Sequence, residues 1–182
     1  MYKLVADSSC DIYTFPKAPF AAVPLTIATD TESFRDDASL NIPEMLRVLR
    51  EHKGRSYTAC PNIGQWLSAF EGTDTVYAVT ITSALSGSYN AAMAAREIFE
   101  QEHPEARVHV FDTLSTGPEA LLLLEKLAEL AGSGLDFDSV VEKALDYQCR
   151  TRLFFSLHSL HNLAQNGRVS KVAAAAVGVM NI

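Results

Sequence analysis

The chain has 182 residues, 48% of them hydrophobic, with a formal net charge of −7. This size and composition fit a globular protein with one well-packed core rather than a disordered chain. The negative charge argues against binding to nucleic acid or to anionic lipid surfaces, since both depend on clustered lysine and arginine.

The cysteine pattern and the apolar runs indicate the cellular setting. The three cysteines are odd in number, widely spaced and without a C-x-x-C pair, which favours a reduced, cytoplasmic protein. The longest apolar run, residues 172–180, is too short to cross a bilayer, so no integral membrane segment is expected. The chain enters a strand at once, so no signal peptide is expected.

Apolar runs alternate with helical patterns along the chain. Strands are expected at residues 3–6, 22–27, 75–81, 107–111 and 153–156. Helices are expected at 43–52, 63–71, 87–102, 118–131 and 137–148, with shorter ones at 157–165 and 170–179. Because the strands are continuous apolar runs, this order predicts an α/β domain of three layers, a parallel sheet with helices on both faces. The acidic segment 29–40 is expected to be a solvated loop.

Three of the predicted strands end in turns rich in aspartate, serine and threonine, at residues 7–11, 82–88 and 112–117. A fourth hydroxyl-bearing segment, residues 56–62, precedes the predicted helix at 63–71. The carboxyl ends of parallel strands share one edge of a sheet, where ligands bind, so these turns are expected to converge. Helix capping explains each turn equally well when it is taken alone.

The segment 76–90 is the most informative of these. It reads as a buried strand, a hydroxyl-rich turn and a helix that begins at Gly87, an arrangement that offers hydroxyl and backbone N–H groups to an anion. The turn has no lysine and therefore is not a nucleotide-binding P-loop. Such a turn suits one small negative group, such as a carboxylate, better than a triphosphate.

Other chemistries are less well supported. The segment around Ser86 lacks the first glycine of a nucleophile elbow and the downstream order of acid and histidine that a serine hydrolase needs. His158 and His161 are three residues apart, without further metal ligands nearby in sequence, so no metal site is expected. Asp7, Asp11 and Asp112 are interpreted as turn and cap residues, and Cys60 as a residue that lines the site. Arg168 lies at the start of the last predicted helix, where the dipole disfavours a cation, and it is either an anion or partner contact or an ordinary surface arginine.

Six motifs occur in an order that carries a family resemblance. They are Asp7-Ser8-Ser9-x-Asp11, Val23-Pro24-Leu25, Thr58-x-x-Pro61, Ile81-Thr82-Ser83-x-Leu85-Ser86-Gly87-Ser88-Tyr89-Asn90, Asp112-x-x-Ser115-Thr116-Gly117 and Gly167-Arg168-Val169-Ser170. Together they resemble the DegV family of fatty-acid-binding proteins, the acyl-carrying subunits of bacterial fatty acid kinase. The match extends over nearly the whole chain.

The resemblance implies a carrier without catalytic residues, metal or cofactor. Its ligand would be a long-chain fatty acid, whose carboxylate Thr58 and Ser86 would bind and which a separate kinase subunit would phosphorylate. Arg168 falls on the arginine implicated in contact with that kinase. The supporting residues expected to line the site are Ser8, Ser9, Cys60, Ser83, Gly87, Ser88, Ser115 and Thr116.

The resemblance also concerns the extent of the domain and the places where this chain departs from the family. Residues 1–182 would form the amino-terminal α/β domain, and about 157–182 would begin the link to a carboxy-terminal domain that this chain lacks. The family's Thr-Ser-Gln-Pro-Ser is changed to residues 58–62 of this chain, which include Cys60, and Asn166 replaces the first glycine of Gly-Gly-Arg. Two other functions stay open: an α/β hydrolase or phosphotransferase acting on a small carboxylic acid, and a regulatory or interaction protein that binds no lipid.

Overall fold

The main sheet consists of four parallel strands in the order β2-β1-β6-β7. The computed structural model describes residues 1–157 and 159–169. The strands are β1 (Lys3–Asp7), β2 (Phe20–Val23), β6 (Thr75–Thr80) and β7 (Arg107–Asp112). In the central register Val5 pairs with Ala21 on one side and with Ala78 on the other. The predicted parallel sheet is therefore confirmed.

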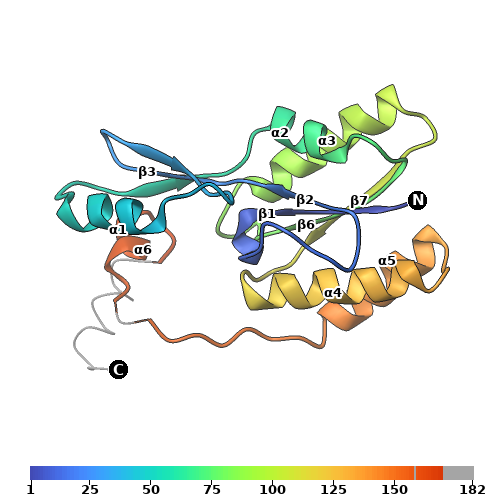
Figure 1. Cartoon of the computed structure of the whole chain (residues 1–182). Coiled ribbons are helices and arrows are strands. Elements are labelled where there is room, and N and C mark those ends of the chain that lie inside the picture. The colour runs from blue at the N-terminus through green and yellow to red at the C-terminus, as the bar shows by residue number, and fades with distance from the viewer. Residues whose placement is uncertain (158, 170–182) are drawn as a thin grey trace.

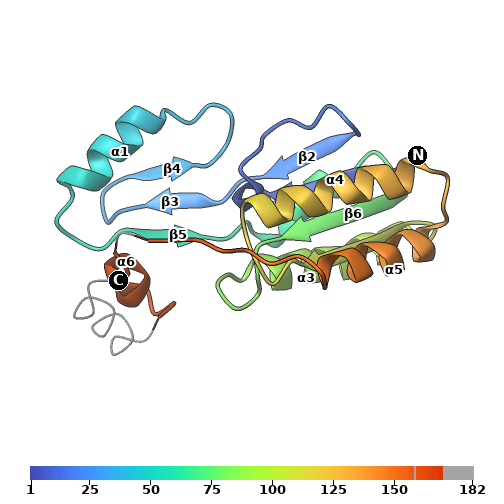
Figure 2. The same ribbon diagram turned by 90° about the horizontal axis from the view of Figure 1, so that it is seen from below.

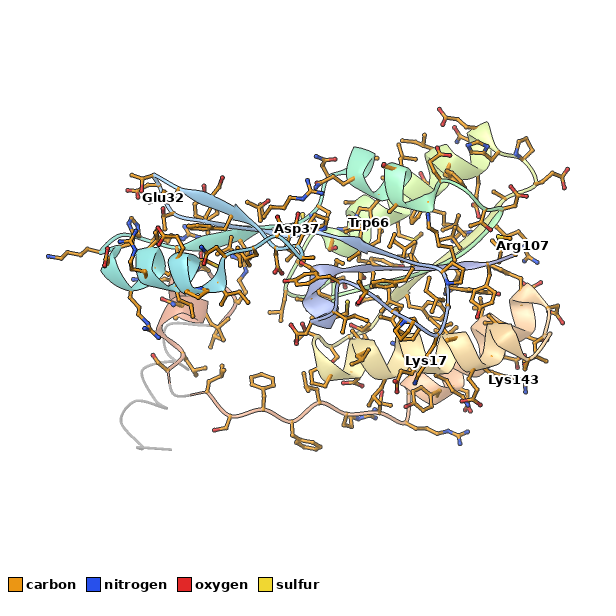
Figure 3. The ribbon with its side chains drawn as sticks, viewed as in Figure 1. Lys17, Glu32, Asp37, Trp66, Arg107 and Lys143 are labelled. Atoms are coloured by element: carbon orange, nitrogen blue, oxygen red, sulfur yellow. The ribbon has the colours of Figure 1, made fainter. Side chains whose placement is uncertain are left out.

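Helices cover both faces of this sheet, as Figure 1 shows. The helices α2 (Ile63–Phe70) and α3 (Ser88–Glu102) pack on one face, and α4 (Pro118–Gly132) and α5 (Phe137–Gln148) on the other. Side chains alternate along the strands, so that Val5 faces α2 and α3 while Leu4 faces α4. Trp66, labelled in Figure 3, is fully buried between α2 and the sheet.

A second, smaller sheet lies beside the first and was not expected. It is antiparallel, in the order β4-β3-β5, and consists of β3 (Thr26–Ala28), β4 (Ser33–Arg35) and β5 (Tyr57–Ala59). Figures 1 and 2 both place α1 (Ile42–Glu51) beside it. The single strand predicted at 22–27 is wrong, because Pro24 separates β2 from β3. The solvated loop predicted at 29–40 is wrong in part, since it contains β4.

The local start signals of the helices agree with the structure. The side chain of Asn41 accepts a hydrogen bond from the Glu44 N–H at the start of α1. Asn62 and Gln65 form a reciprocal capping box at the start of α2. The two caps therefore set the residues at which α1 begins beside the small sheet and at which α2 begins after β5.

After α5 the chain runs extended towards the small sheet, as Figure 2 shows. The strand predicted at 153–156 is wrong: this segment pairs with no strand, and Phe154 and Phe155 are 90% and 71% exposed. The short helix predicted at 157–165 is present only as α6 (His161–Gln165). The helix predicted at 170–179 lies outside the described residues.

Candidate functional site

A groove of about 500 Å³ lies among the small sheet, α1, the turn after β6, and α6. Most of its lining is apolar and comes from Leu25, Ile27, Leu49, Ile81, Leu85 and Leu163. Hydroxyl and amide groups are added by Ser56, Thr58, Ser86, Asn162 and Asn166. Within residues 1–157 and 159–169, Arg168 is the one charged residue that lines the groove. An apolar groove with a few polar groups is the usual form of a small-molecule site.

Thr58 reaches this groove from β5, where it pairs with Ile27 of β3 in antiparallel register. Its side chain is exposed, and its hydroxyl has no hydrogen-bond partner among residues 1–157 and 159–169. The hydroxyl is thus available to an incoming acceptor.

Ser86 reaches the groove from the turn between β6 and α3. The Ser86 N–H donates to the Thr82 carbonyl at 3.2 Å, and the Ser86 Oγ accepts from the Ser88 N–H at 3.2 Å. Since this contact uses a lone pair of the oxygen, the hydroxyl proton stays available for a ligand.

Cys60 and Gly87 bring these two segments into contact. Both residues line the groove, and a Cβ placed at Gly87 would lie 3.3 Å from the Cys60 Sγ. Glycine at this position therefore permits the close approach of the turn to the end of β5. Thr58, Ser86, Cys60 and Gly87, which the sequence had suggested as site residues, share one groove.

Asp7 holds the turn that carries Ser86 by hydrogen bonds to residues on both sides of that turn. This carboxylate is 1% exposed and accepts hydrogen bonds from the Ser88 hydroxyl at 2.6 Å, the Ser9 hydroxyl at 2.5 Å and the Ile81 N–H at 3.0 Å. Burial raises the pKa of Asp7, and the hydrogen bonds partly oppose that shift. Asp7 occupies the N-cap position of the short helix that follows, η1 (Ser8–Cys10), as expected, but its side chain makes no cap bond there and holds the Ser86 turn instead.

Three of the supporting residues are used inside the protein rather than at the groove. Ser9 and Ser88 donate to Asp7, as described above. The Ser8 hydroxyl donates to Asp36 Oδ2 at 2.7 Å and accepts from the Leu25 N–H at 3.0 Å. These serines do not line the groove; they hold the loops that surround it.

The remaining supporting residues follow β6 and β7. The Asp112 side chain accepts from the backbone N–H groups of Ser83 and Leu114, in agreement with its interpretation as a turn residue. Ser115 and Thr116 line a second cavity, of about 660 Å³, which meets the groove at Leu85. The predicted convergence of the turns is therefore partial, because their hydroxyls are divided between two cavities and the interior.

Arg168 also lines the groove and lies just after the end of α6, while the helix expected to begin after it, at 170–179, lies outside the described residues. The Gly167 N–H donates to the Ala164 carbonyl and the Arg168 N–H to the Leu163 carbonyl at 2.8 Å, with Gly167 at φ 73°. This is the Schellman ending of α6. At the end of α6 the dipole favours a cation.

Metal ligands and membrane-crossing helices are absent from the described part of the chain. No group of three or more histidine, cysteine, aspartate or glutamate side chains there is arranged to hold a metal ion. None of its helices is long and apolar enough to cross a membrane. His158, considered above as a metal ligand, lies outside the described residues.

Comparison of the chain with known proteins shows which family it belongs to. A family model described as "uncharacterised protein, DegV family" matches residues 1–182. A DegV domain-containing protein of Streptococcus pneumoniae is 43% identical over 185 residues, which are 100% of this chain and 66% of that protein. The chain therefore spans slightly less than two thirds of the length of this relative.

Two solved structures are similar over almost the whole chain. A DegV family protein from Eubacterium eligens, loaded with heptadecanoic acid, is 53% identical with a TM-score of 0.94, over 98% of this chain and 64% of its own. The Streptococcus pneumoniae Fatty Acid Kinase (Fak) B3 protein, loaded with linoleic acid, is 43% identical with a TM-score of 0.95, over 100% of this chain and 66% of its own. The chain described here belongs to the DegV family.

Proposed function

We propose that this protein binds a long-chain fatty acid in the groove, with the carboxylate on the hydroxyls of Thr58 and Ser86. One observation carries the proposal: both hydroxyls lie in a groove whose lining is mostly apolar, and neither donates to an acceptor among the described residues. The fatty acids bound by the relatives from Eubacterium eligens and Streptococcus pneumoniae support the same ligand class.

The two parts of such a ligand contribute differently to binding. Each buried methylene contributes about 0.8 kcal/mol, so a tail of about sixteen carbons offers of order 10 kcal/mol before ordering costs. A hydroxyl that donates to a carboxylate contributes about 1.5–3 kcal/mol. The tail therefore sets the affinity and the hydroxyls set the orientation of the ligand.

The protein acts in this proposal as a carrier rather than an enzyme. It holds the carboxylate for phosphorylation by a separate kinase subunit, a role supported by the fatty acid kinase name of one relative. Arg168, exposed at the edge of the groove, is then a contact for the kinase. The carboxy-terminal domain implied by the resemblance remains a prediction.

The proposal is tested by analysis of what the purified protein carries. Mass spectrometry of the native protein and of its organic extract should give one long-chain fatty acid per chain. The Thr58→Val/Ser86→Ala double variant, purified in parallel, should carry much less. Absence of acyl chains even after incubation with palmitic acid would refute the proposal. Turnover of small carboxylic esters would favour a hydrolase instead.

A further inference from the structure

The second cavity continues the groove past Leu85, a residue that lines both of them. The turns that carry the two cavities are joined by hydrogen bonds. The Ser86 N–H donates to the Thr82 carbonyl at 3.2 Å, and the Thr82 N–H donates to the Ser115 carbonyl at 2.8 Å. A ligand whose carboxylate lies at Ser86 can therefore extend its tail into the second cavity. The apolar part of that cavity's lining comes from Leu85, Leu114, Leu145, Leu153 and Phe155.

Two buried polar atoms of this cavity have no hydrogen-bond partner among residues 1–157 and 159–169. They are the Ser115 Oγ and the Gln148 Oε1. Ser115 is only 8% exposed. The neighbouring Thr113 hydroxyl, by contrast, donates to the Thr80 carbonyl at 2.8 Å and accepts from the Ser115 N–H at 3.1 Å. An unpaired buried polar atom destabilises the fold, so a pair of them in one cavity indicates a ligand group that completes their hydrogen bonds.

The free atoms restrict the kind of group that fits. The Gln148 Nε2 donates to the Asp112 carbonyl at 2.8 Å, which leaves Oε1 as the unpaired atom of that amide. An amide oxygen only accepts, so its partner must carry an O–H or N–H group. The Ser115 hydroxyl both donates and accepts. A hydroxyl group on the ligand can pair with either residue, whereas a methylene can pair with neither.

The charges of the cavity favour a neutral group. Glu119 and Arg152 are the two charged side chains of its lining in the described part of the chain. The Glu119 carboxylate accepts from the Thr151 hydroxyl, and the Arg152 Nη1 donates to the Cys149 carbonyl at 2.8 Å. Because the two opposite charges already have partners, they leave no net charge to attract a second ion. The cavity therefore suits an uncharged polar group on an otherwise apolar ligand.

We propose that the second cavity takes the tail of the fatty acid and that Ser115 and Gln148 select a tail that bears a hydroxyl group. This inference rests on the proposed function and deepens it, because it names a substrate class for the same site, the hydroxy fatty acids. A pocket built to hydrogen-bond a hydroxyl rejects an analogue that lacks it, since the pocket's own buried polar atoms then stay unpaired.

The test compares ligands that share a carboxylate and a tail length. Octadecanoic acid and a set of hydroxyoctadecanoic acids, with the hydroxyl at successive positions along the tail, each displace a fluorescent fatty acid from the protein. At least one hydroxy acid should bind about tenfold more tightly than octadecanoic acid, as expected for one hydrogen bond regained between buried groups. Ser115→Ala should remove most of this preference. It should leave the affinity for octadecanoic acid and the stability in urea unchanged, because the Ser115 Oγ has no partner among the described residues.

Two further variants complete the test. Gln148→Met removes the free amide oxygen and should also lower the preference, while Ser68→Ala, which removes an exposed hydroxyl of α2 outside both cavities, should keep it. A wild type that binds octadecanoic acid and prefers no hydroxy acid would overturn this inference alone. A preference that survives in both Ser115→Ala and Gln148→Met would also overturn it. Failure of the wild type to bind any of these acids would instead refute the proposed function.

Discussion

Replacing Thr58 by valine separates the hydroxyl from the shape of the side chain. Valine keeps the β-branched form that suits a strand and removes only the hydrogen-bond donor. Because the Thr58 side chain is exposed and has no hydrogen-bond partner among the described residues, the free energy of unfolding should change little. Any loss of fatty-acid affinity in the variant should therefore come from the missing contact with the ligand and not from a change in the fold.

The size of that loss follows from the proposed contact. A hydroxyl that donates to a carboxylate contributes about 1.5–3 kcal/mol, which corresponds to about one to two decades in affinity. The methylenes of the tail keep their contacts with the apolar lining, so the variant should still bind weakly. Binding of the matching fatty alcohol should fall less, because its headgroup is uncharged.

Displacement of a fluorescent fatty acid by palmitic acid at fixed salt measures the effect. Ser68→Ala is the matched control, because it removes an exposed hydroxyl from α2 that does not line the groove. If Thr58→Val binds palmitic acid as tightly as the wild type and the control, Thr58 does not bind the carboxylate and the reasoning fails.

Three further predictions concern the turn that carries Ser86. Ser86→Ala should weaken fatty-acid binding by about one to two decades and also destabilise the fold by about 0.5–1.5 kcal/mol in urea, since the Ser88 N–H loses its acceptor; unchanged binding would contradict this. Ser88→Ala should cost about 1–3 kcal/mol of unfolding free energy, because buried Asp7 loses a donor at 2.6 Å, and a loss no larger than that of Ser68→Ala would count against it. Burial raises the pKa of Asp7 above its ordinary 3.8, so the folded state binds this proton more tightly than the unfolded chain. As pH rises from about 4 through the folded pKa, the wild type should lose stability relative to Asp7→Asn, and a pH-independent difference in urea midpoint would refute this.

The main sheet and its helices are predictable because their signals are local. Runs such as residues 75–81 and 107–111 are largely buried, and capping side chains mark the starts of α1, α2 and α5. The small sheet was missed for the opposite reason. Its strands are only three residues long: β4 and β5 have no apolar period, β5 is exposed throughout, and β3 is concealed in the apolar run at 22–27. Only pairing across distant segments makes them strands.

Two apolar segments were misread as continuous or paired strands. Pro24 has no N–H to donate, which explains why the run at 22–27 is divided between two sheets. The run at 153–156 has a strand-like composition, yet Phe154 and Phe155 are exposed and unpaired. An apolar composition indicates that a segment favours burial, but it does not identify the surface on which the segment would be buried.

The candidate site, like the fold, was predictable only in part from the sequence. Hydroxyls in the turns look alike in sequence, and Ser86 and Ser88 differ by only two positions. Ser88, the first residue of α3, is buried and donates a hydrogen bond to Asp7 at the end of β1, whereas Ser86 lies at the groove. The hydrogen bonds of Asn166 could not be predicted for the same reason, because its partners Arg55 and Ser56 are distant in sequence.

The central claim is that the hydroxyls of Thr58 and Ser86 together bind the carboxylate of a fatty acid. A crystal structure of the protein saturated with palmitic acid tests it most directly. The account predicts carboxylate oxygens within about 2.5–2.8 Å of Thr58 Oγ1 and Ser86 Oγ, with the tail against the apolar lining of the groove. A carboxylate bound elsewhere, or a ligand inserted with its methyl end at Thr58, would contradict it.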